Sequence, residues 1–283
     1  MPMTQDCIRK HYEDAWKSKS DAASCVDEIA YSSPIEDAVL YPLYTQLLAD
    51  LKVKVDGGKV LDVGSGSGRW VRFFLDRYAP ALYTGMDYAK ASIELLARWF
   101  PQEQHPNTTL EFRHASIADP NLDLEQRYDL INVANVLFHI PEQELFANSL
   151  KNLAEHLADD GRIVTTEYLP RVTMRTEWML VRSRYEFEAA CAAAGLRIVS
   201  IRAFGIFAND PMGIDGPDAT TRGLFMRCRQ QAQSLINGVA DANGNRFIVN
   251  FLTDVERAVL AYRRERVAEI DLPSQKLVVL ARA

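Results

Sequence analysis

The sequence lacks the features that mark membrane proteins, zinc sites and disulfide frameworks. Its 283 residues include only four cysteines, which lie far apart, with no Cys-x-x-Cys pair and no Cys/His cluster. Neither a zinc site nor a set of structural disulfides is therefore predicted. Apolar runs are too short to cross a bilayer, and the polar, charged N-terminal residues are unlike a signal peptide. We accordingly expect a cytoplasmic protein that does not enter a membrane.

Negatively charged residues outnumber positively charged ones. The chain has 32 Lys and Arg residues against 38 Asp and Glu residues, a formal net charge of −6, and no long basic run. Because nucleic-acid phosphates bind basic surfaces, nucleic acid is a poor candidate partner. No compact acidic constellation is visible either, and no metal site is predicted. With 48% hydrophobic residues, the chain has the composition of a globular protein with a real core.

From Lys59 onward, short apolar strands alternate with amphipathic helices. This alternation predicts an α/β fold with a doubly wound, mostly parallel sheet and helices on both faces. The predicted strands are KVLDV, LYTGMD, TLEFRH, YDLINVANVL, RIVTTEYL, RIVSIRAFG and KLVVLARA. Ser183 and Glu186 predict a capping box at the start of one helix, and Gly195 predicts its end.

Three regions are expected along the chain. Residues 1–55 are predicted to form a helical cap, in which Ser33 is the N-cap of a helix that begins at Pro34. Residues 56–205 and 275–283 form the core, and residues 206–274 are a helical insertion before the last strand. Insertions of this length usually carry function. This one is expected to be a lid over the binding site or a dimerisation element, so a homodimer is one expectation.

The segment KVLDVGSGSGRW joins the first core strand to the next helix through three glycines. Ligands of such sheets bind where the first helix begins. A dinucleotide loop, G-x-G-x-x-G, needs a glycine at position 69, where the chain has Arg69. A phosphate-binding G-x-x-x-x-G-K-[ST] loop also needs a glycine at position 69, followed by a lysine, and the chain has neither. The spacing therefore argues against both of these nucleotide loops.

The run from Asp62 to Gly68 instead resembles the first motif of class I S-adenosylmethionine-dependent methyltransferases, D/E-x-G-x-G-x-G. The later segments that resemble the family occur in the expected order over residues 59–205. The resemblance implies a seven-stranded sheet whose last strand, KLVVLARA, is antiparallel. It also implies S-adenosylmethionine as the cofactor and methyl transfer as the activity.

The resemblance further implies a set of cofactor contacts. Asp87, at the end of the second strand, would accept hydrogen bonds from the ribose hydroxyls, and Tyr88 would stack on the adenine. Ser116 stands where family members often carry Asp, with Asp119 as a substitute, and Ile117 would contact the adenine. The full predicted set is Asp62, Gly64, Gly66, Gly68, Asp87, Tyr88, Ser116, Ile117 and Asn135.

Two residues are candidates for acid–base chemistry. His139 follows the fourth strand, where the family places the reactive methyl group, and histidine suits proton abstraction near neutral pH. The alternative is that His139 packs or bonds the loop. Glu167, at the end of the fifth strand, would be a base or would bind the acceptor hydroxyl, unless it is simply a charged strand end.

Aromatic and basic residues outside the core motifs are candidates for an acceptor wall. Tyr12 and Trp16 are four residues apart on one helical face and are expected to form a lid. Arg175 and Trp178 follow the fifth strand and are placed near the acceptor on position alone. Packing within the core is the alternative for the aromatic residues.

These patterns lead to one functional hypothesis with open alternatives. The hypothesis is methyl transfer from S-adenosylmethionine to a hydroxyl oxygen of a small molecule, such as a sugar or another polyhydroxylated metabolite. Asn132-Val-Ala-Asn135 stands where enzymes that methylate nucleic-acid bases often carry N/D-P-P-Y, which argues against that substrate class. The alternatives are N- or C-methylation of a small metabolite, a nicotinamide-dependent oxidoreductase, and a non-catalytic cofactor-binding subunit.

Overall fold

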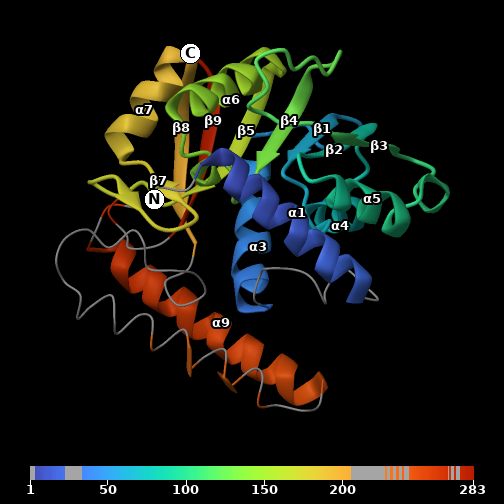
Figure 1. The fold of residues 1–283 in the computed structure, drawn as a ribbon. Coiled ribbons are helices and arrows are strands. Elements are labelled where there is room, and N and C mark those ends of the chain that lie inside the picture. The colour runs from blue at the N-terminus through green and yellow to red at the C-terminus, as the bar shows by residue number, and fades with distance from the viewer. Residues whose placement is uncertain are drawn as a thin grey trace.

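The computed structural model describes residues 4–22, 34–204, 242–266 and 275–283, with isolated residues between 227 and 271 (Figure 1). A seven-stranded sheet in the order β3-β2-β1-β4-β5-β9-β8 forms its centre. The strands are β1 (Lys59–Val63), β2 (Leu82–Asp87), β3 (Thr109–His114), β4 (Tyr128–Val133), β5 (Leu157–Glu167), β8 (Leu196–Ala203) and β9 (Lys276–Arg282). The predicted α/β fold is confirmed.

Strand direction changes at one edge of the sheet. β1 to β5 pair in parallel, whereas β9 lies between β5 and β8 and pairs antiparallel with both. The predicted antiparallel last strand is therefore confirmed. The carboxyl ends of β1, β2, β3 and β4 meet at one edge, which is where a doubly wound sheet binds its ligands.

Helices cover both faces of the sheet. On one face, α3, α4 and α5 pack on alternate residues of the strands, and on the other face α6 and α7 pack on the residues between them. Each layer is apolar because side chains alternate across a strand. The helices are α3 (Pro34–Asp50), α4 (Arg69–Arg77), α5 (Lys90–Trp99), α6 (Gln143–Glu155) and α7 (Arg184–Ala193).

Local signals in the sequence place some boundaries well and others poorly. The capping box of Ser183 and Glu186 is present at the start of α7, and Gly195 after its end has a φ of 73°. β5 begins at Leu157, before the predicted Arg162, because Leu157 pairs with Tyr128 across an irregularity in the ladder. The small hairpin of β6 (Met174–Arg175) and β7 (Leu180–Val181) was not predicted.

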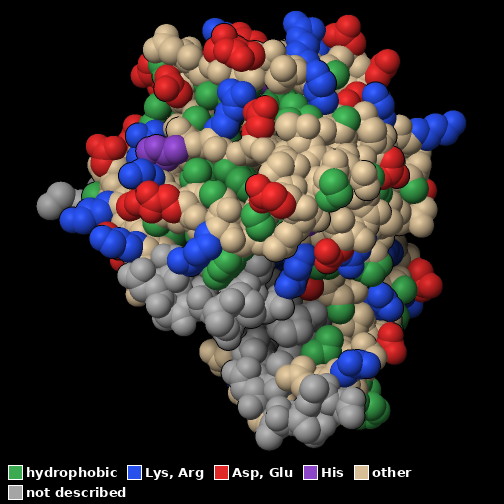
Figure 2. Space-filling model, turned by 90° about the vertical axis from the view of Figure 1, so that its right-hand side faces the viewer, with side chains coloured by type: hydrophobic (Ala, Val, Ile, Leu, Met, Phe, Trp, Pro, Cys, Tyr) green, Lys and Arg blue, Asp and Glu red, His purple; other side chains and the backbone are tan. Residues whose placement is uncertain are grey.

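Two helices lie outside the sheet layers. α1 (Gln5–Ala22) crosses the carboxyl edge of the parallel strands and packs against α5, and α9 (Ala242–Arg264) packs against α3 (Figure 1). Most of the predicted insertion at 206–274, and the predicted N-cap Ser33, lie outside the described residues. Lys and Arg side chains are interspersed with Asp and Glu on the face that Figure 2 shows. In the described part of the chain, no helix is long and apolar enough to span a membrane.

Candidate cofactor and active site

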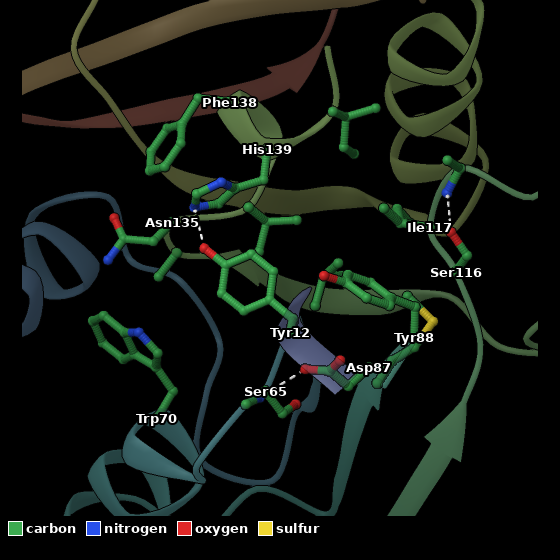
Figure 3. Close-up of a pocket in the computed structure, with 18 of the residues that line it drawn as sticks. Tyr12, Ser65, Trp70, Asp87, Tyr88, Ser116, Ile117, Asn135, Phe138 and His139 are labelled. Atoms are coloured by element: carbon green, nitrogen blue, oxygen red, sulfur yellow. Dashed lines mark hydrogen bonds between the residues drawn. The ribbon is translucent and has the colours of Figure 1, made fainter. Parts of the chain in front are cut away.

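A cavity of about 320 Å³ lies at the carboxyl ends of the parallel strands (Figure 3). Residues from the loops after β1, β2, β3 and β4 line it, and α1 contributes Gln5, Tyr12 and Trp16. The cavity therefore brings together the predicted cofactor loops and part of the predicted lid.

The three glycines of the first loop have positive φ angles of 71°, 51° and 85° at Gly64, Gly66 and Gly68. A Cβ atom at Gly64 would lie 2.4 Å from a methyl carbon of Val136, and one at Gly66 would lie 2.9 Å from the Trp16 ring. Backbone conformation and close packing both call for glycine here. Gly64 and Gly66 line the cavity, whereas Gly68 is the N-cap of α4 and does not.

Asp62 lies beneath the glycine loop and is not among the residues that line the cavity. Its carboxylate accepts hydrogen bonds from Asn132 Nδ2 at 2.7 Å and from the Tyr83 hydroxyl at 2.9 Å. Burial raises the pKa of Asp62 to about 6, although both hydrogen bonds oppose that shift. Because Asn132 belongs to β4 and Tyr83 to β2, Asp62 ties β1 to its two neighbours.

Asp87 lies at the cavity surface with its carboxylate already oriented. Its oxygens accept hydrogen bonds from the backbone N–H groups of Gly66 at 2.9 Å and Ala89 at 2.8 Å. Burial raises its pKa, and the two backbone donors offset part of this shift. The Ser92 side chain also hydrogen-bonds this carboxylate, and since a carboxylate has about four lone-pair sites, at least one remains for a ribose hydroxyl.

Tyr88, Ser116 and Ile117 line the same part of the cavity. The Ser116 hydroxyl oxygen accepts hydrogen bonds from Arg9 Nη2 at 3.1 Å and from the Ala118 backbone N–H at 3.3 Å. The Arg9 guanidinium also lies 6.0 Å from the centre of the Tyr88 ring. Helix α1 is thereby fastened to the loop that follows β3.

Asn135 lines the cavity in a left-handed backbone conformation, with a φ of 60°. Its backbone N–H donates to the Thr166 hydroxyl at 2.7 Å, and that hydroxyl donates back to Asn135 Oδ1 at 2.9 Å. Gln275 also donates to Asn135 Oδ1. Asparagine tolerates this conformation better than most residues, and these bonds hold it there.

Tyr12 and His139 form a hydrogen-bonded pair inside the cavity (Figure 3). The Tyr12 hydroxyl lies 3.0 Å from His139 Nε2, and His139 Nδ1 lies 2.9 Å from the Trp178 carbonyl oxygen. Because a carbonyl only accepts, Nδ1 carries the proton, and Nε2 accepts from Tyr12. Burial lowers the pKa of His139 to about 4, so the ring is neutral at pH 7.

The predicted lid residues do not all reach the cavity. Trp16 lines it and covers Gly66, and Tyr12 meets His139 as described. Trp178 instead holds His139 through its carbonyl, and its ring lies 4.0 Å from that of His11 on α1. Arg175 is exposed and does not line the cavity.

Glu167 is buried but is not among the residues that line the cavity. It accepts a hydrogen bond from the Thr165 hydroxyl at 2.9 Å. Burial raises its pKa to about 8, and the Thr165 hydrogen bond and the Arg182 charge offset only part of this shift. The structure thus separates Glu167 from His139, and only His139 is positioned to touch a ligand in the cavity.

The cavity also contains residues that the sequence analysis did not select. Gln5, seven positions before Tyr12 on one face of α1, could have been found from helical spacing. Several of the others adjoin predicted residues, since Arg69 and Trp70 end the glycine-loop segment, and the rest come from segments that carry no motif. These other residues include Glu36, Arg69, Trp70, Phe138, Tyr168, Met179 and Gln275.

A scan against protein-family models matches residues 38–201 to the family described as methyltransferase domain. The chain belongs to this family. Its activity is therefore S-adenosylmethionine-dependent methyl transfer, which decides against the nicotinamide alternative. The comparison with curated proteins found no match.

Among solved structures, the methyltransferase is similar to the [4+2]-cyclase SpnF, with 15% identity and a TM-score of 0.58 over 99% of this chain and 97% of that one. A SAM-dependent methyltransferase from Leishmania major matches at 17% identity and a TM-score of 0.55, covering 75% and 79%. The N-methyltransferase NodS from Bradyrhizobium japonicum matches at 17% identity and a TM-score of 0.51, covering 70% and 90%. Likeness at this level concerns the fold, and function must be argued from the site.

The cavity of the methyltransferase fits a nucleoside cofactor. Gly64 and Gly66 line the cavity with backbone that carries no side chain, and Asp87 presents its oriented carboxylate beside them. Gln5 adds a buried side-chain oxygen without a hydrogen-bond partner among the described residues. Among those same residues, no group of three or more His, Cys, Asp or Glu is arranged to hold a metal ion.

Proposed function

We propose that the enzyme methylates a hydroxyl oxygen of a small, polyhydroxylated and uncharged acceptor, such as a sugar. The observation that carries this proposal is the hydrogen bond between Tyr12 and the neutral His139 inside the cavity. S-adenosylmethionine, when bound, supplies a methyl group already activated for transfer. The protein must therefore align the acceptor and remove its proton.

The Tyr12–His139 pair offers a route for that proton. Tyr12 donates its hydroxyl proton to His139 Nε2, and the Tyr12 oxygen would accept the proton of the acceptor hydroxyl. As the acceptor oxygen loses its proton to Tyr12, the proton of Tyr12 passes to His139. The Trp178 carbonyl, which accepts from Nδ1–H, would stabilise the imidazolium that forms. Because alcohols are weak acids, this transfer would accompany methyl transfer rather than precede it.

The charges around the cavity favour an uncharged acceptor. Arg69 is the one Lys or Arg among the described lining residues, and it already pairs with Glu36 at 3.2 Å and with Asp37. Its Nε also donates to the Tyr41 hydroxyl. The guanidinium is therefore engaged, and it is poorly placed to bind a phosphate or carboxylate of the acceptor.

The remaining lining suits a ligand with hydroxyl groups and apolar faces. Trp70, Phe138 and Tyr168 supply aromatic surface, while Gln275 supplies amide groups. Sugars present both kinds of surface, and small-molecule sites commonly combine an apolar wall with a few polar groups. These features support the small-molecule class, while the Tyr12–His139 pair supports oxygen as the methylated atom.

The test is methyl transfer from isotopically labelled S-adenosylmethionine to a panel of sugars, polyols, amines and carbon nucleophiles. Mass spectrometry would locate the methyl group in any product. We expect methyl ethers of uncharged hydroxyl compounds. Transfer confined to nitrogen or carbon acceptors would overturn the proposal, and the absence of turnover with every acceptor would favour a non-catalytic subunit.

Variants at the proton route sharpen the test. We expect Tyr12→Phe and His139→Ala to lower kcat by about 100-fold or more, in keeping with acid–base catalysis. Their Kd for S-adenosylhomocysteine should change little by comparison. Tyr185→Phe is the matched control, because that tyrosine is 81% exposed. Unchanged kcat in both Tyr12→Phe and His139→Ala would rule out the proposed route.

A further inference from the structure

Gln5 has a buried side-chain oxygen that lacks a hydrogen-bond partner in the described part of the chain. The residue is 6% exposed, lines the cavity, and its side-chain Oε1 lacks a hydrogen bond among the described residues. A buried carbonyl oxygen normally finds a donor. In a cavity built for a ligand, the missing donor is expected to belong to that ligand.

The contacts of α1 fix where Gln5 lies along the cavity. The Gln5 backbone N–H donates to Glu142, next to α6, at 3.0 Å. One turn later Arg9 bonds Ser116, and about two turns after Gln5 the Tyr12 hydroxyl meets His139. Seven residues of helix separate Gln5 from Tyr12 by about 10 Å. Gln5 and Tyr12 therefore enter the cavity from positions about two turns apart on α1.

Ser116, to which Arg9 bonds one turn of α1 beyond Gln5, also lines the cavity and offers the opposite hydrogen-bonding role. Its oxygen already accepts from Arg9 and from the Ala118 backbone N–H, so its own O–H is left to donate. The two residues together present one acceptor, Gln5 Oε1, and one donor, the Ser116 hydroxyl. Both line the cavity, as Ile117 does.

We propose that Gln5 and Ser116 recognise the adenine base of the cofactor. The hydrogen-bonding edge of adenine carries an exocyclic amino group beside a ring nitrogen, which are a donor and an acceptor. Gln5 Oε1 would accept from the amino group, and Ser116 would donate to the ring nitrogen. Gln5 is then a specificity-determining residue that the N-terminal helix supplies, and the assignment does not depend on the acceptor.

The test compares two ligands by calorimetry. S-adenosylhomocysteine carries the amino group, whereas S-inosylhomocysteine has a carbonyl there and a proton on the ring nitrogen, which reverses both roles. A buried polar site rejects a mismatched ligand strongly. We expect the wild-type protein to bind the adenosyl compound at least about 30-fold more tightly, and Gln5→Met to reduce that ratio to about threefold or less.

Two further variants separate recognition from general damage. Gln5→Glu keeps an acceptor oxygen and should keep the preference for the adenosyl compound. Gln275→Met changes the other glutamine that lines the cavity, which bonds Asn135, and should leave the ratio at the wild-type value. The ratio compares the Kd values of the two ligands for the same variant, so a variant that binds both ligands more weakly still gives a valid ratio.

An unchanged ratio in Gln5→Met would overturn the inference, as would equal binding of the two compounds by the wild-type protein. The experiment contains no methyl acceptor and measures no turnover. If the enzyme proves not to methylate hydroxyl groups, the measured preference for adenine still stands. If Gln5 proves not to recognise adenine, the proposed hydroxyl methylation is unaffected.

Discussion

The Asp87 carboxylate shapes the glycine loop and faces the cavity at the same time. Its hydrogen bonds from Gly66 and Ala89 fix its orientation before any ligand arrives. Such preorganisation lowers the cost of ordering side chains on binding. The residue is thus a structural support for the loop and the expected receiver of the ribose hydroxyls.

We predict that Asp87→Asn raises the Kd for S-adenosylhomocysteine by about 10- to 100-fold, since hydrogen bonds to a charged group are worth roughly 1.5–3 kcal/mol. Calorimetry measures the change. Asp76→Asn, on the outer part of α4, is a control that should bind like the wild type. If the Kd of Asp87→Asn stays within about twofold of the wild-type value, Asp87 does not bind the ribose hydroxyls.

Spacing within the sequence was enough to place the cavity residues of the glycine loop and Asp87. It was not enough for Asp62 and Glu167, because a position at the end of a strand does not tell which way the side chain points. Side chains alternate across a strand, so Glu167 shares a face with Ile163, which packs in the α6 and α7 layer. The alternation of side chains along this strand could have shown from the sequence that Glu167 points away from the cavity.

Helix α1 is the element that closes the cavity. Its residues reach the Ser116 loop, His139 and Gly66 in turn, and its Glu13 accepts a hydrogen bond from the Ala91 N–H at the start of α5. Tyr12 and Trp16 of α1 line the cavity, so movement of α1 would widen its opening. Helix α1 is therefore expected to be the gate as well as the lid.

We predict that S-adenosylhomocysteine slows hydrogen–deuterium exchange over residues 5–16, together with the glycine loop. Local opening of α1 would then require release of the ligand. Helix α9 serves as an internal reference, because it packs on α3 and its described residues do not line the cavity. Protection confined to the glycine loop, with α1 exchanging at the same rate with and without ligand, would contradict the gate.

The amphipathic pattern of α1 predicted a helix whose Tyr12 and Trp16 share a face, but not the surface on which it lies. That surface is assembled from the ends of β2, β3 and β4, which are distant in sequence. The hydrogen bonds of Arg9 and Tyr12 that decide the docking are single contacts without a motif. The lid role of the insertion stays a prediction, and α9 itself lies against α3.

At the scale of the whole molecule, buried carboxyl groups make stability depend on pH. The pKa of Glu167 is about 8 in the folded protein, against an ordinary value of 4.5, because the group is buried. Between those values, the folded state holds a proton that the unfolded state has lost. Unfolding then releases a proton, so stability falls as pH rises toward 8.

We predict that the Tm of the wild type falls by about 5 °C between pH 6.5 and 9 and that Glu167→Gln removes most of this fall. Thermal unfolding followed by calorimetry measures the difference. Glu144→Gln, at an exposed position of α6, is the control, and its Tm should fall with pH by the same amount as that of the wild type. Equal pH dependence in Glu167→Gln and the wild type would show that Glu167 is ionised in the folded protein.

The alternation of strands and helices was sufficient to predict the sheet of the whole molecule, because a parallel sheet needs a crossover between neighbouring strands. Residues 38–201, which match the family, contain that alternation almost entirely. The lining of the cavity around the cofactor depends on side chains from α1, from α3 and from Gln275 just before β9. Their convergence is a property of packing that spacing along the chain does not encode.

The most direct test is a crystal structure with S-adenosylhomocysteine bound. We predict that the ribose hydroxyls bind Asp87, that the adenine lies between Tyr88 and Ile117 with its amino group on Gln5, and that the sulfur faces the Tyr12–His139 pair. A ligand bound elsewhere, or one whose sulfur faces away from Tyr12 and His139, would contradict the account.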